Sequence, residues 1–337
     1  NTTGGYNVVA GQAAMRDNNT GANNSAFGHN ALKSNTTASN NTAVGMSALL
    51  ANTTGTQNVA VGSSSLITNT TGGQNTAVGL NSLLLNTTGS YNSTLGIQAL
   101  NSNTTASNNV AMGYQSLYAN TTGTQNVAVG SSSLITNTTG SYNTALGRTS
   151  LLANTIGTHN SAMGRSALQN NTTGSYNTGL GMDAGGSTTT GNYNVSVGFN
   201  ATATSSTAGN QCTLGDANIT NLRCNDGSIS SLSDSRDKTD VIDSPYGLDF
   251  INTVRPVQYL WDTRDGNVKD GTTRIGFLAQ ELLAATNGNN AVLDLVLDDN
   301  PDKLEAKYGN LLPIMVQAIQ ELSTQNAALE ARLTALE

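Results

Sequence analysis

The sequence predicts a mostly β chain: a parallel β-roll, or solenoid, of 17-residue repeats, then a small α+β domain and a C-terminal coiled-coil helix. Asn recurs at every seventeenth position from Asn7 to Asn194 without an insertion. Only 36% of the residues are apolar and 10% are charged, which suits order by repetition better than one large core. The predicted segments are the roll at 1–215, a β-structured neck at 216–232, the α+β domain at 233–309 and the coiled coil at 310–337.

Each repeat reads as a single turn of a solenoid. In the unit that begins at Asn58, a short β-rich segment ends at Val61, and Gly62 follows where a side chain would clash or φ must be positive. Leu66 then marks a further apolar segment, and an Asn-Thr-Thr-Gly turn closes the unit. Gly and Leu recur at the same spacing, so we expect coils stacked about 4.8 Å apart.

The strand of each unit carries apolar residues on both faces. Ala60 and Val61 are neighbours, and neighbouring residues of a strand point to opposite sides of the sheet. One side can face the interior of the coil, whereas the other needs a partner, which we expect to be the same strand of a neighbouring chain. The repeated Asn predicts a ladder of side-chain amides that bond to backbone groups of adjacent turns.

Charge and cysteine content argue against several functions. The formal net charge is −7 and Lys and Arg form no stripe, so nucleic-acid binding is not expected. Cys212 and Cys224 are the only cysteines and lack CxxC spacing. We therefore expect two unpaired thiols, with a bridge between chains as the alternative, and neither a metal site nor a cofactor. No run of eighteen apolar residues is present, so membrane insertion is not expected.

The repeats also lack the carboxylates of an enzyme. Residues 1–210 contain only Asp17 and Asp183, far apart in the array, and no Glu precedes Glu281. Glycosidases need a pair of carboxylates about 5–10 Å apart, so a glycan depolymerase is not expected. No aromatic cluster or charge group is expected to mark a receptor site. The scattered tyrosines suit turn packing equally well: Tyr91, Tyr114, Tyr118, Tyr142 and Tyr176.

The run Ser233-Asp234-Ser235-Arg236-Asp237-Lys238 separates the repeat from the mixed domain. If the local turn folds Lys238 back onto the hydroxyl of Ser233, the two form a nucleophile and base pair, because a desolvated lysine can lose its proton near neutral pH. On spacing alone, a solvated linker is the better interpretation. Ser-Asp-Ser also suits a helix N-cap, which is the competing role for Asp234.

Both sides of this run have local patterns. The alternation in 219–224 predicts short strands in the neck, whereas 248–253 predicts a helix and 256–261 and 274–278 predict strands. The C-terminal residues step by three and four alternately, which predicts a coiled coil with Asn326 at an a position that fixes register, with a helix that binds a partner protein as the alternative. The seam consists of Leu312, Met315, Ile319, Leu322, Asn326, Leu329, Leu333 and Leu336.

Residues 218–280 resemble the intramolecular chaperone domain of phage tail fibres and tailspikes, the S74 peptidase family. The resemblance rests on 221–224, 229–234, Arg236, Lys238, 246–251, 255–256, Tyr259, Trp261 and 275–280. It implies that Ser233 is the nucleophile of a self-cleavage between Leu232 and Ser233, with Lys238 as its base. It also implies that the domain helps three chains to assemble and is then cut away. Each chain would cleave itself once and would not act on other substrates.

The repeats resemble the head repeats of trimeric autotransporter adhesins, through the Asn-x-Ala-x-Gly core seen from Asn58 to Gly62. This resemblance implies a left-handed parallel β-roll and a homotrimer. Together the two resemblances lead us to expect a phage tail-fibre protein of the virion that binds a host cell-surface receptor, either a glycan or an outer-membrane component. The alternatives are a bacterial trimeric surface adhesin and, because of the repeated Thr-Thr pair, an ice-binding solenoid.

Overall fold

The computed structural model divides the chain into two compact units, residues 1–216 and 217–337, which we call the solenoid and the C-terminal unit. The solenoid is a parallel β-structure, and the C-terminal unit combines two small sheets with helices. The predicted mostly β fold class is therefore confirmed. The structure describes residues 3–219, 222–223, 233–262 and 271–336.

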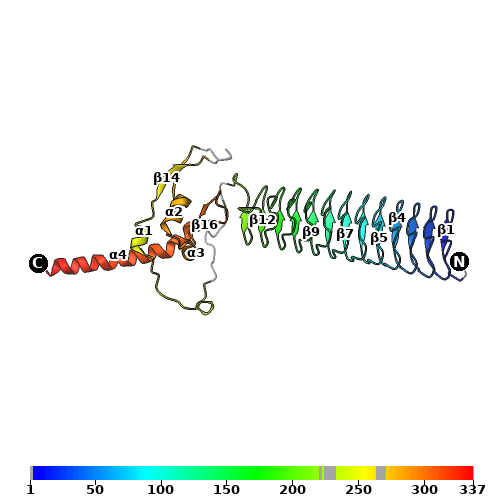
Figure 1. The fold of residues 1–337 in the computed structure, drawn as a ribbon, viewed down its shortest axis with the longest axis horizontal. Coiled ribbons are helices and arrows are strands. Elements are labelled where there is room, and N and C mark those ends of the chain that lie inside the picture. Colours follow the sequence, from blue (N-terminus) through cyan, green and yellow to red (C-terminus); the bar gives the residue numbers. More distant parts are fainter. Residues whose placement is uncertain (1–2, 220–221, 224–232, 263–270, 337) are drawn as a thin grey trace. The chain divides into compact units, whose positions relative to one another are not determined.

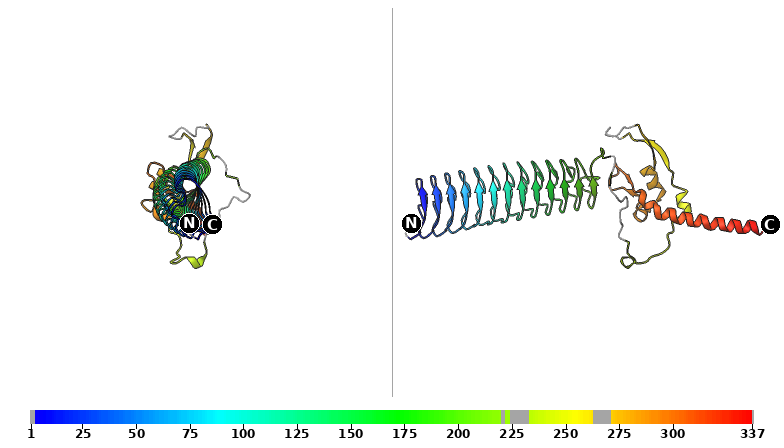
Figure 2. Two further views of the ribbon diagram at one scale, coloured as in Figure 1. Left: turned by 90° about the vertical axis from the view of Figure 1, so that its right-hand side faces the viewer. Right: turned by 180° about the vertical axis from the view of Figure 1, so that it is seen from behind.

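The solenoid is built on one sheet of thirteen three-residue strands, in which consecutive strands pair with each other. Each pairing joins residues 17 apart, as Val59 with Thr76, so the sequence period is the register of the sheet. The rungs follow one another along the solenoid (Figures 1 and 2). The strands are β1 (Val8–Ala10), β2 (Ser25–Phe27), β3 (Thr42–Val44), β4 (Val59–Val61), β5 (Thr76–Val78), β6 (Ser93–Leu95), β7 (Val110–Met112), β8 (Val127–Val129), β9 (Thr144–Leu146), β10 (Ser161–Met163), β11 (Thr178–Leu180), β12 (Val195–Val197) and β13 (Cys212–Leu214).

The interior of the solenoid is filled by small and medium side chains. The middle residue of β4, Ala60, points inward and is fully buried, and so is Leu66 farther along the same rung. Leu66 adopts a φ of 51°, so the further apolar segment of the repeat is a left-handed corner. The left-handed region costs about 1–2 kcal/mol for a side chain of this kind, whereas burying a Leu contributes about 1.5–3 kcal/mol. Burial therefore outweighs the backbone cost.

The glycine that ends each strand is required by the stacking. Gly62 has a φ of +130°, and a Cβ placed on it would lie 2.5 Å from the carbonyl oxygen of Gly79 in the next rung. A side chain there would both strain the backbone and push the rungs apart. The prediction that this position must be glycine is confirmed.

Two columns of asparagine hold neighbouring rungs together. Asn75 donates from Nδ2 to the carbonyl of Gly89 at 2.9 Å, while its backbone N–H donates to Oδ1 of Asn58 at 3.0 Å. In the second column, Asn69 donates from Nδ2 to Oδ1 of Asn52 at 2.9 Å and to the carbonyl of Gly72 at 2.9 Å. The predicted amide ladder is therefore confirmed. Among the buried side-chain N and O atoms of the described residues, only Thr188 Oγ1 lacks a partner.

The C-terminal unit has a small apolar core beneath its longest helix. Strand β14 pairs antiparallel with β15, and β16 with β17. The core gathers Leu282, Leu293, Leu295, Val296, Leu311 and Ile314. Its elements are η1 (Ser235–Asp237), α1 (Leu248–Ile251), β14 (Val257–Leu260), β15 (Thr273–Gly276), α2 (Ala279–Ala285), α3 (Asn290–Leu293), β16 (Val296–Leu297), β17 (Glu305–Ala306), η2 (Tyr308–Asn310) and α4 (Leu311–Thr334).

The aromatic residues of the C-terminal unit pack against one another. Tyr246 meets Phe250 edge to face at 5.8 Å, and Tyr259 meets Trp261 in the same way at 5.5 Å. Such pairs contribute about 0.5–1.5 kcal/mol beyond the area they bury. The helix and the two strands expected around them are found at 248–251, 257–260 and 273–276.

Candidate functional site

The chain between Ser233 and Lys238 makes a tight turn. Asp234 is the N-cap of η1, and its carboxylate accepts a hydrogen bond from the backbone N–H of Arg236 at 2.9 Å. The backbone N–H of Lys238 donates to the carbonyl of the first residue of η1, which closes the turn. The N-cap predicted as a competing role for Asp234 is therefore present, and the same turn returns Lys238 toward Ser233.

Ser233 and Lys238 are in direct contact. Nζ of Lys238 donates to Oγ of Ser233 at 2.5 Å, and both side chains are exposed. A general base must instead accept the hydroxyl proton, for which it needs a neutral amine, and desolvation favours that form. The turn therefore brings the predicted nucleophile and base together, and both side chains are exposed in the part of the chain that the structure describes.

The guanidinium of Arg236 holds Asp234 in place. Nη2 lies 2.6 Å from Oδ2, and Nε lies 3.0 Å from Oδ1. This side-chain hydrogen bond lowers the pKa of Asp234, and the backbone N–H of Arg236 lowers it further. The carboxylate that caps the turn thus keeps its charge into more acid solution than a free aspartate does.

Several predictions for the neck lie outside the described residues. Leu232, on the acyl side of the predicted scissile bond, is among them, and so is Cys224. Of the neck at 216–232, the structure describes 216–219 and 222–223. Cys212, at the start of β13, is unpaired and exposed.

An apolar column, the outer stripe, runs along the outside of the solenoid. Its members are the third residues of the thirteen strands, all apolar and all in register with one another. Leu95 is 53% exposed and Leu180 46%. A soluble monomer rarely leaves so long an apolar surface open. The outer stripe consists of Ala10, Phe27, Val44, Val61, Val78, Leu95, Met112, Val129, Leu146, Met163, Leu180, Val197 and Leu214.

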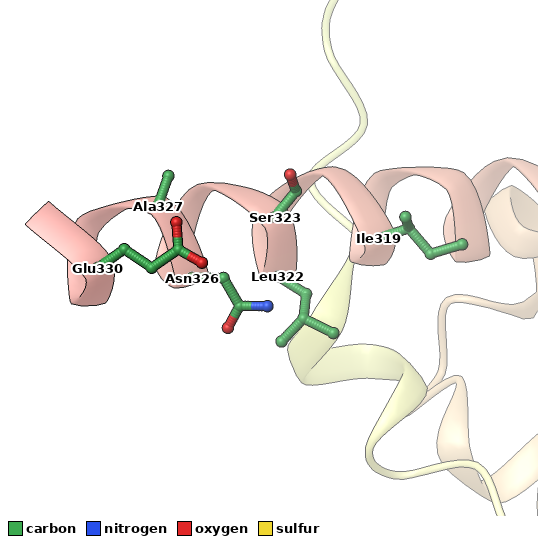
Figure 3. Close-up of a pocket in the computed structure, with 6 residues that line it drawn as sticks. All are labelled: Ile319, Leu322, Ser323, Asn326, Ala327 and Glu330. Atoms are coloured by element: carbon green, nitrogen blue, oxygen red, sulfur yellow. The ribbon is translucent and has the colours of Figure 1, made fainter.

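Helix α4 has two apolar faces. Leu311, Ile314 and Ala318 are buried against the C-terminal unit. The face predicted as a heptad seam is exposed, and Ile319 is 64% accessible. A pocket of about 370 Å³ on this helix has walls from α4 alone, formed by Ile319, Leu322, Ser323, Asn326, Ala327 and Glu330 (Figure 3). Asn326 thus lies on an open surface, beside apolar side chains that the C-terminal unit leaves uncovered.

A stack of aromatic rings, which we call the aromatic ladder, crosses four rungs of the solenoid. The ring of His159 lies 4.7 Å from that of Tyr142 and 4.8 Å from that of Tyr176, and Tyr176 lies 4.9 Å from Tyr193. The interplanar angles are 15°, 13° and 4° respectively. Tyr142 and Tyr176, which the sequence suggested were scattered, are therefore members of one stack.

The ladder occupies a position at which asparagine is the easier choice. Tyr142 has a φ of 61° and Tyr176 a φ of 60°, a region that Asn adopts more readily than bulky residues. Asn40 and Asn108 fill the same position in other rungs, with φ of 63° and 62°. Stacking returns only about 0.5–1.5 kcal/mol per pair, which is similar to the backbone cost. The fold alone therefore gives little reason for aromatic residues there.

The sequence signal for the ladder is the repeat period itself. Tyr142, His159, Tyr176 and Tyr193 are each 17 residues apart. Within a single repeat none of these residues stands out, and the column is visible only when one position is compared across repeats. Because the strands pair in parallel and in register, residues that are 17 apart in the sequence lie next to each other in neighbouring rungs.

The described residues show neither a metal cluster nor a membrane span. In the part of the chain that the structure describes, no three His, Cys, Asp or Glu side chains come together as a metal site. Among the same residues, no helix combines the length and the hydropathy that crossing a bilayer demands.

Comparison with known proteins gives one finding. Residues 233–293 match the family model Peptidase_S74, described as chaperone of endosialidase. This segment matches the S74 chaperone family. The match begins at Ser233, the residue predicted to be the nucleophile. No curated protein matches the chain, and no solved structure matches it.

Proposed function

We propose that the chain is a trimeric tail-fibre protein of a bacteriophage, a host-attachment module of the virion whose C-terminal unit chaperones trimer assembly. The observation that carries the proposal is the S74 match from Ser233 to residue 293, in a chain that also holds a 13-rung solenoid with an uncovered apolar outer stripe. An assembly chaperone is useful where long apolar surfaces such as the outer stripe must pair in register with those of other chains.

Two surfaces support a homotrimer. The outer stripe presents apolar side chains over about 58 Å of stacked rungs, and α4 presents the heptad seam that includes Asn326. Each surface is regular along its whole length, so another copy of the same chain matches it in spacing. Three-strandedness follows from the two family resemblances.

We expect the α4 helices to pair first. Residues 17 apart pair between neighbouring rungs of one chain, whereas the outer stripes of different chains bury little until they are in register. Pairing of the α4 helices first would hold three solenoids close together and raise their effective concentration. The C-terminal unit would thus act before the rungs of different chains meet.

Self-cleavage before Ser233 is part of the proposal. The neutral amine of Lys238 removes the proton of Oγ of Ser233, and the oxygen attacks the carbonyl carbon of Leu232. The peptide nitrogen of Ser233 leaves with a proton, and an ester joins the two residues. Water then hydrolyses the ester, which yields a carboxylate at Leu232 and restores the hydroxyl of Ser233. Burial of the exposed Ser233–Lys238 pair in the trimer would favour the neutral amine.

The full chain tests this proposal by sedimentation and cell binding. We expect a trimer that binds bacterial cells, and a Leu95→Ser, Leu180→Ser double variant that forms less trimer, with the same far-ultraviolet circular dichroism, because only α4 still holds its chains together. Thr178→Ser, on the same outer face, is the matched control and should remain trimeric. A wild-type monomer, or binding to animal matrix proteins in place of bacterial cells, would overturn the tail-fibre assignment.

A further inference from the structure

We infer that the aromatic ladder is a binding site for a neutral linear polysaccharide that lies along the axis of the solenoid. This inference rests on the proposed host-attachment function and names the chemical class of the receptor. The site consists of the exposed edges of four stacked rings, and none of these residues belongs to the outer stripe or to the S74 segment. The members of the ladder are Tyr142, His159, Tyr176 and Tyr193.

The ladder is preorganised by the backbone. The N–H of Tyr176 donates to the carbonyl of Thr158 at 3.0 Å, and that of Tyr193 donates to the carbonyl of Ser175 at 3.1 Å. The backbone of each of these residues is therefore bonded to the rung before it, and the neighbouring rings limit the rotation of its side chain. Tyr176 and Tyr193 nevertheless remain 47% and 57% exposed. A ligand would meet ring edges and phenol hydroxyls already in place, at little cost in ordering.

Hydroxyl groups flank the ladder on both sides along the chain. Before it lie Ser141, Thr158 and Ser175, and Ser175 Oγ accepts a hydrogen bond from the backbone N–H of Thr158 at 3.0 Å. After it lie Thr144 and Ser161, the outward-facing first residues of their strands. A hydroxyl that accepts from the backbone still has its own proton to donate. Such a surface suits a ligand rich in hydroxyl groups.

The charges near the ladder favour a neutral ligand. Between residues 141 and 195 the only residues with full charges are Arg148, Arg165 and Asp183. That stretch contains no lysine, and the guanidinium of Arg165 lies 3.7 Å from the carboxylate of Asp183, which offsets its charge. A polyanion such as nucleic acid would need clustered cations. The remaining hydroxyl-rich polymer class is a neutral polysaccharide.

The repeat of the site argues for a polymer. Ring centroids recur every 4.7–4.9 Å over four rungs, so equivalent groups are offered at equal steps along the solenoid. A ligand whose own units repeat, as sugars do in a linear chain, can use each step in the same way. A protein interface would instead need an apolar centre, and the continuous apolar column of these rungs is the outer stripe.

The chain supplies a matched control for the ladder. Tyr91 occupies the same position of its own rung, with a φ of 61° and 56% exposure. Its neighbours in the column are Gln74 and Asn108, so no ring stacks on it. Replacing Tyr91 by Asn removes the same side chain from the same backbone setting without touching the ladder.

The test applies the full-length protein to an array of neutral linear oligosaccharides long enough to span four rungs, with acidic oligosaccharides as a second arm. We expect binding to a neutral glycan, and a loss of about tenfold in affinity for the His159→Asn, Tyr176→Asn double variant. Tyr91→Asn should bind as the wild type does. Both variants place Asn where other rungs already have it, and circular dichroism with thermal unfolding verifies their folding.

Each outcome decides the inference. Failure of the wild type to bind any neutral glycan overturns it, and so does binding of acidic glycans alone. Equal losses for Tyr91→Asn and the double variant overturn it as well. Cell binding separates this inference from the proposed function. If the wild type and the double variant attach to bacteria equally, host attachment stands and the ladder is not its site. If the wild type attaches to no bacterium but the ladder variants still lose glycan binding, the tail-fibre assignment fails and the ladder stands.

Discussion

Lys238 donates a hydrogen bond from Nζ to Oγ of Ser233 at 2.5 Å, although both side chains are exposed. The contact depends on one turn of 3-10 helix, η1, which the carboxylate of Asp234 caps. It is therefore made by local structure, and variants of these residues can be compared without loss of the fold.

Replacement of Ser233 or Lys238 should stop self-cleavage. Ser233→Ala removes the nucleophile, and Lys238→Met removes the base. Lys238→Arg keeps a donor for Ser233 but cannot lose its proton in the accessible pH range, so it should also be inactive. Denaturing gels and intact mass measure the two fragments. Two fragments from Ser233→Ala would contradict this chemistry.

Asp234 should affect the rate of cleavage without taking part in it. Asp234→Ala removes both the cap and the partner of Arg236, and cleavage should slow several-fold because Lys238 returns less often to Ser233. Asp234→Asn can still cap the turn and should retain most of the rate. The measurement is the time course of fragment formation for the three proteins. If Asn is as slow as Ala, the ion pair with Arg236 matters more than the cap.

Asn75 should be essential to the stacking of its rung. Asn75→Ala leaves the backbone N–H of Asn92 without its partner at 3.0 Å, and it removes one of the two side-chain donors to the carbonyl of Gly89, which still accepts from Asn86 at 2.9 Å. An unsatisfied buried group costs about 1–3 kcal/mol, so the free energy of unfolding should fall by about that amount. Denaturant unfolding measures it. Thr71→Ala, an exposed change in the neighbouring turn, is the control and should have little effect.

Acid should weaken the contact between α1 and α4. Oε2 of Glu321 accepts from the backbone N–H of Leu248 at 2.8 Å, and this bond lowers the pKa of Glu321 below its usual 4.5. A lowered folded pKa stabilises the fold above the unfolded value, and the benefit is lost as pH falls through the folded value. Fluorescence of Trp261, the only Trp, reports unfolding of the C-terminal unit.

Glu321→Gln is the variant for that measurement. Its thermal midpoint should be lower than that of the wild type at pH 7 and should depend less on pH in the acid range. Equal acid sensitivity of the two proteins would assign the effect to other carboxylates. Glu330→Gln, farther along α4 on its exposed side, is the matched control.

The sequence predicted the solenoid well because its period and its register are the same quantity. Seventeen-residue spacing placed Asn58 under Asn75 and Gly62 under Gly79, and both contacts are found. It did not predict the left-handed φ of Leu66. Propensity disfavours that conformation for Leu, and only burial in the narrow interior explains it.

The site was predictable in part. The Ser233–Lys238 spacing predicts a pair, but the contact depends on the η1 turn, which spacing alone does not specify. The aromatic ladder could have been read from Tyr142 and its successors at the same period. The small C-terminal unit was harder, since its core joins residues as distant as Leu282 and Ile314, a long-range arrangement that local patterns do not specify.

The equality of the rungs also bears on how such a protein changes in evolution. Residues 52–72 and 120–140 are identical in sequence and stand four repeats apart. Since every rung offers the same edges to its neighbours, duplication or loss of whole repeats lengthens or shortens the shaft by about 4.8 Å per repeat. The length of the solenoid can thus be changed by recombination between repeats, while the contacts within the remaining rungs stay the same.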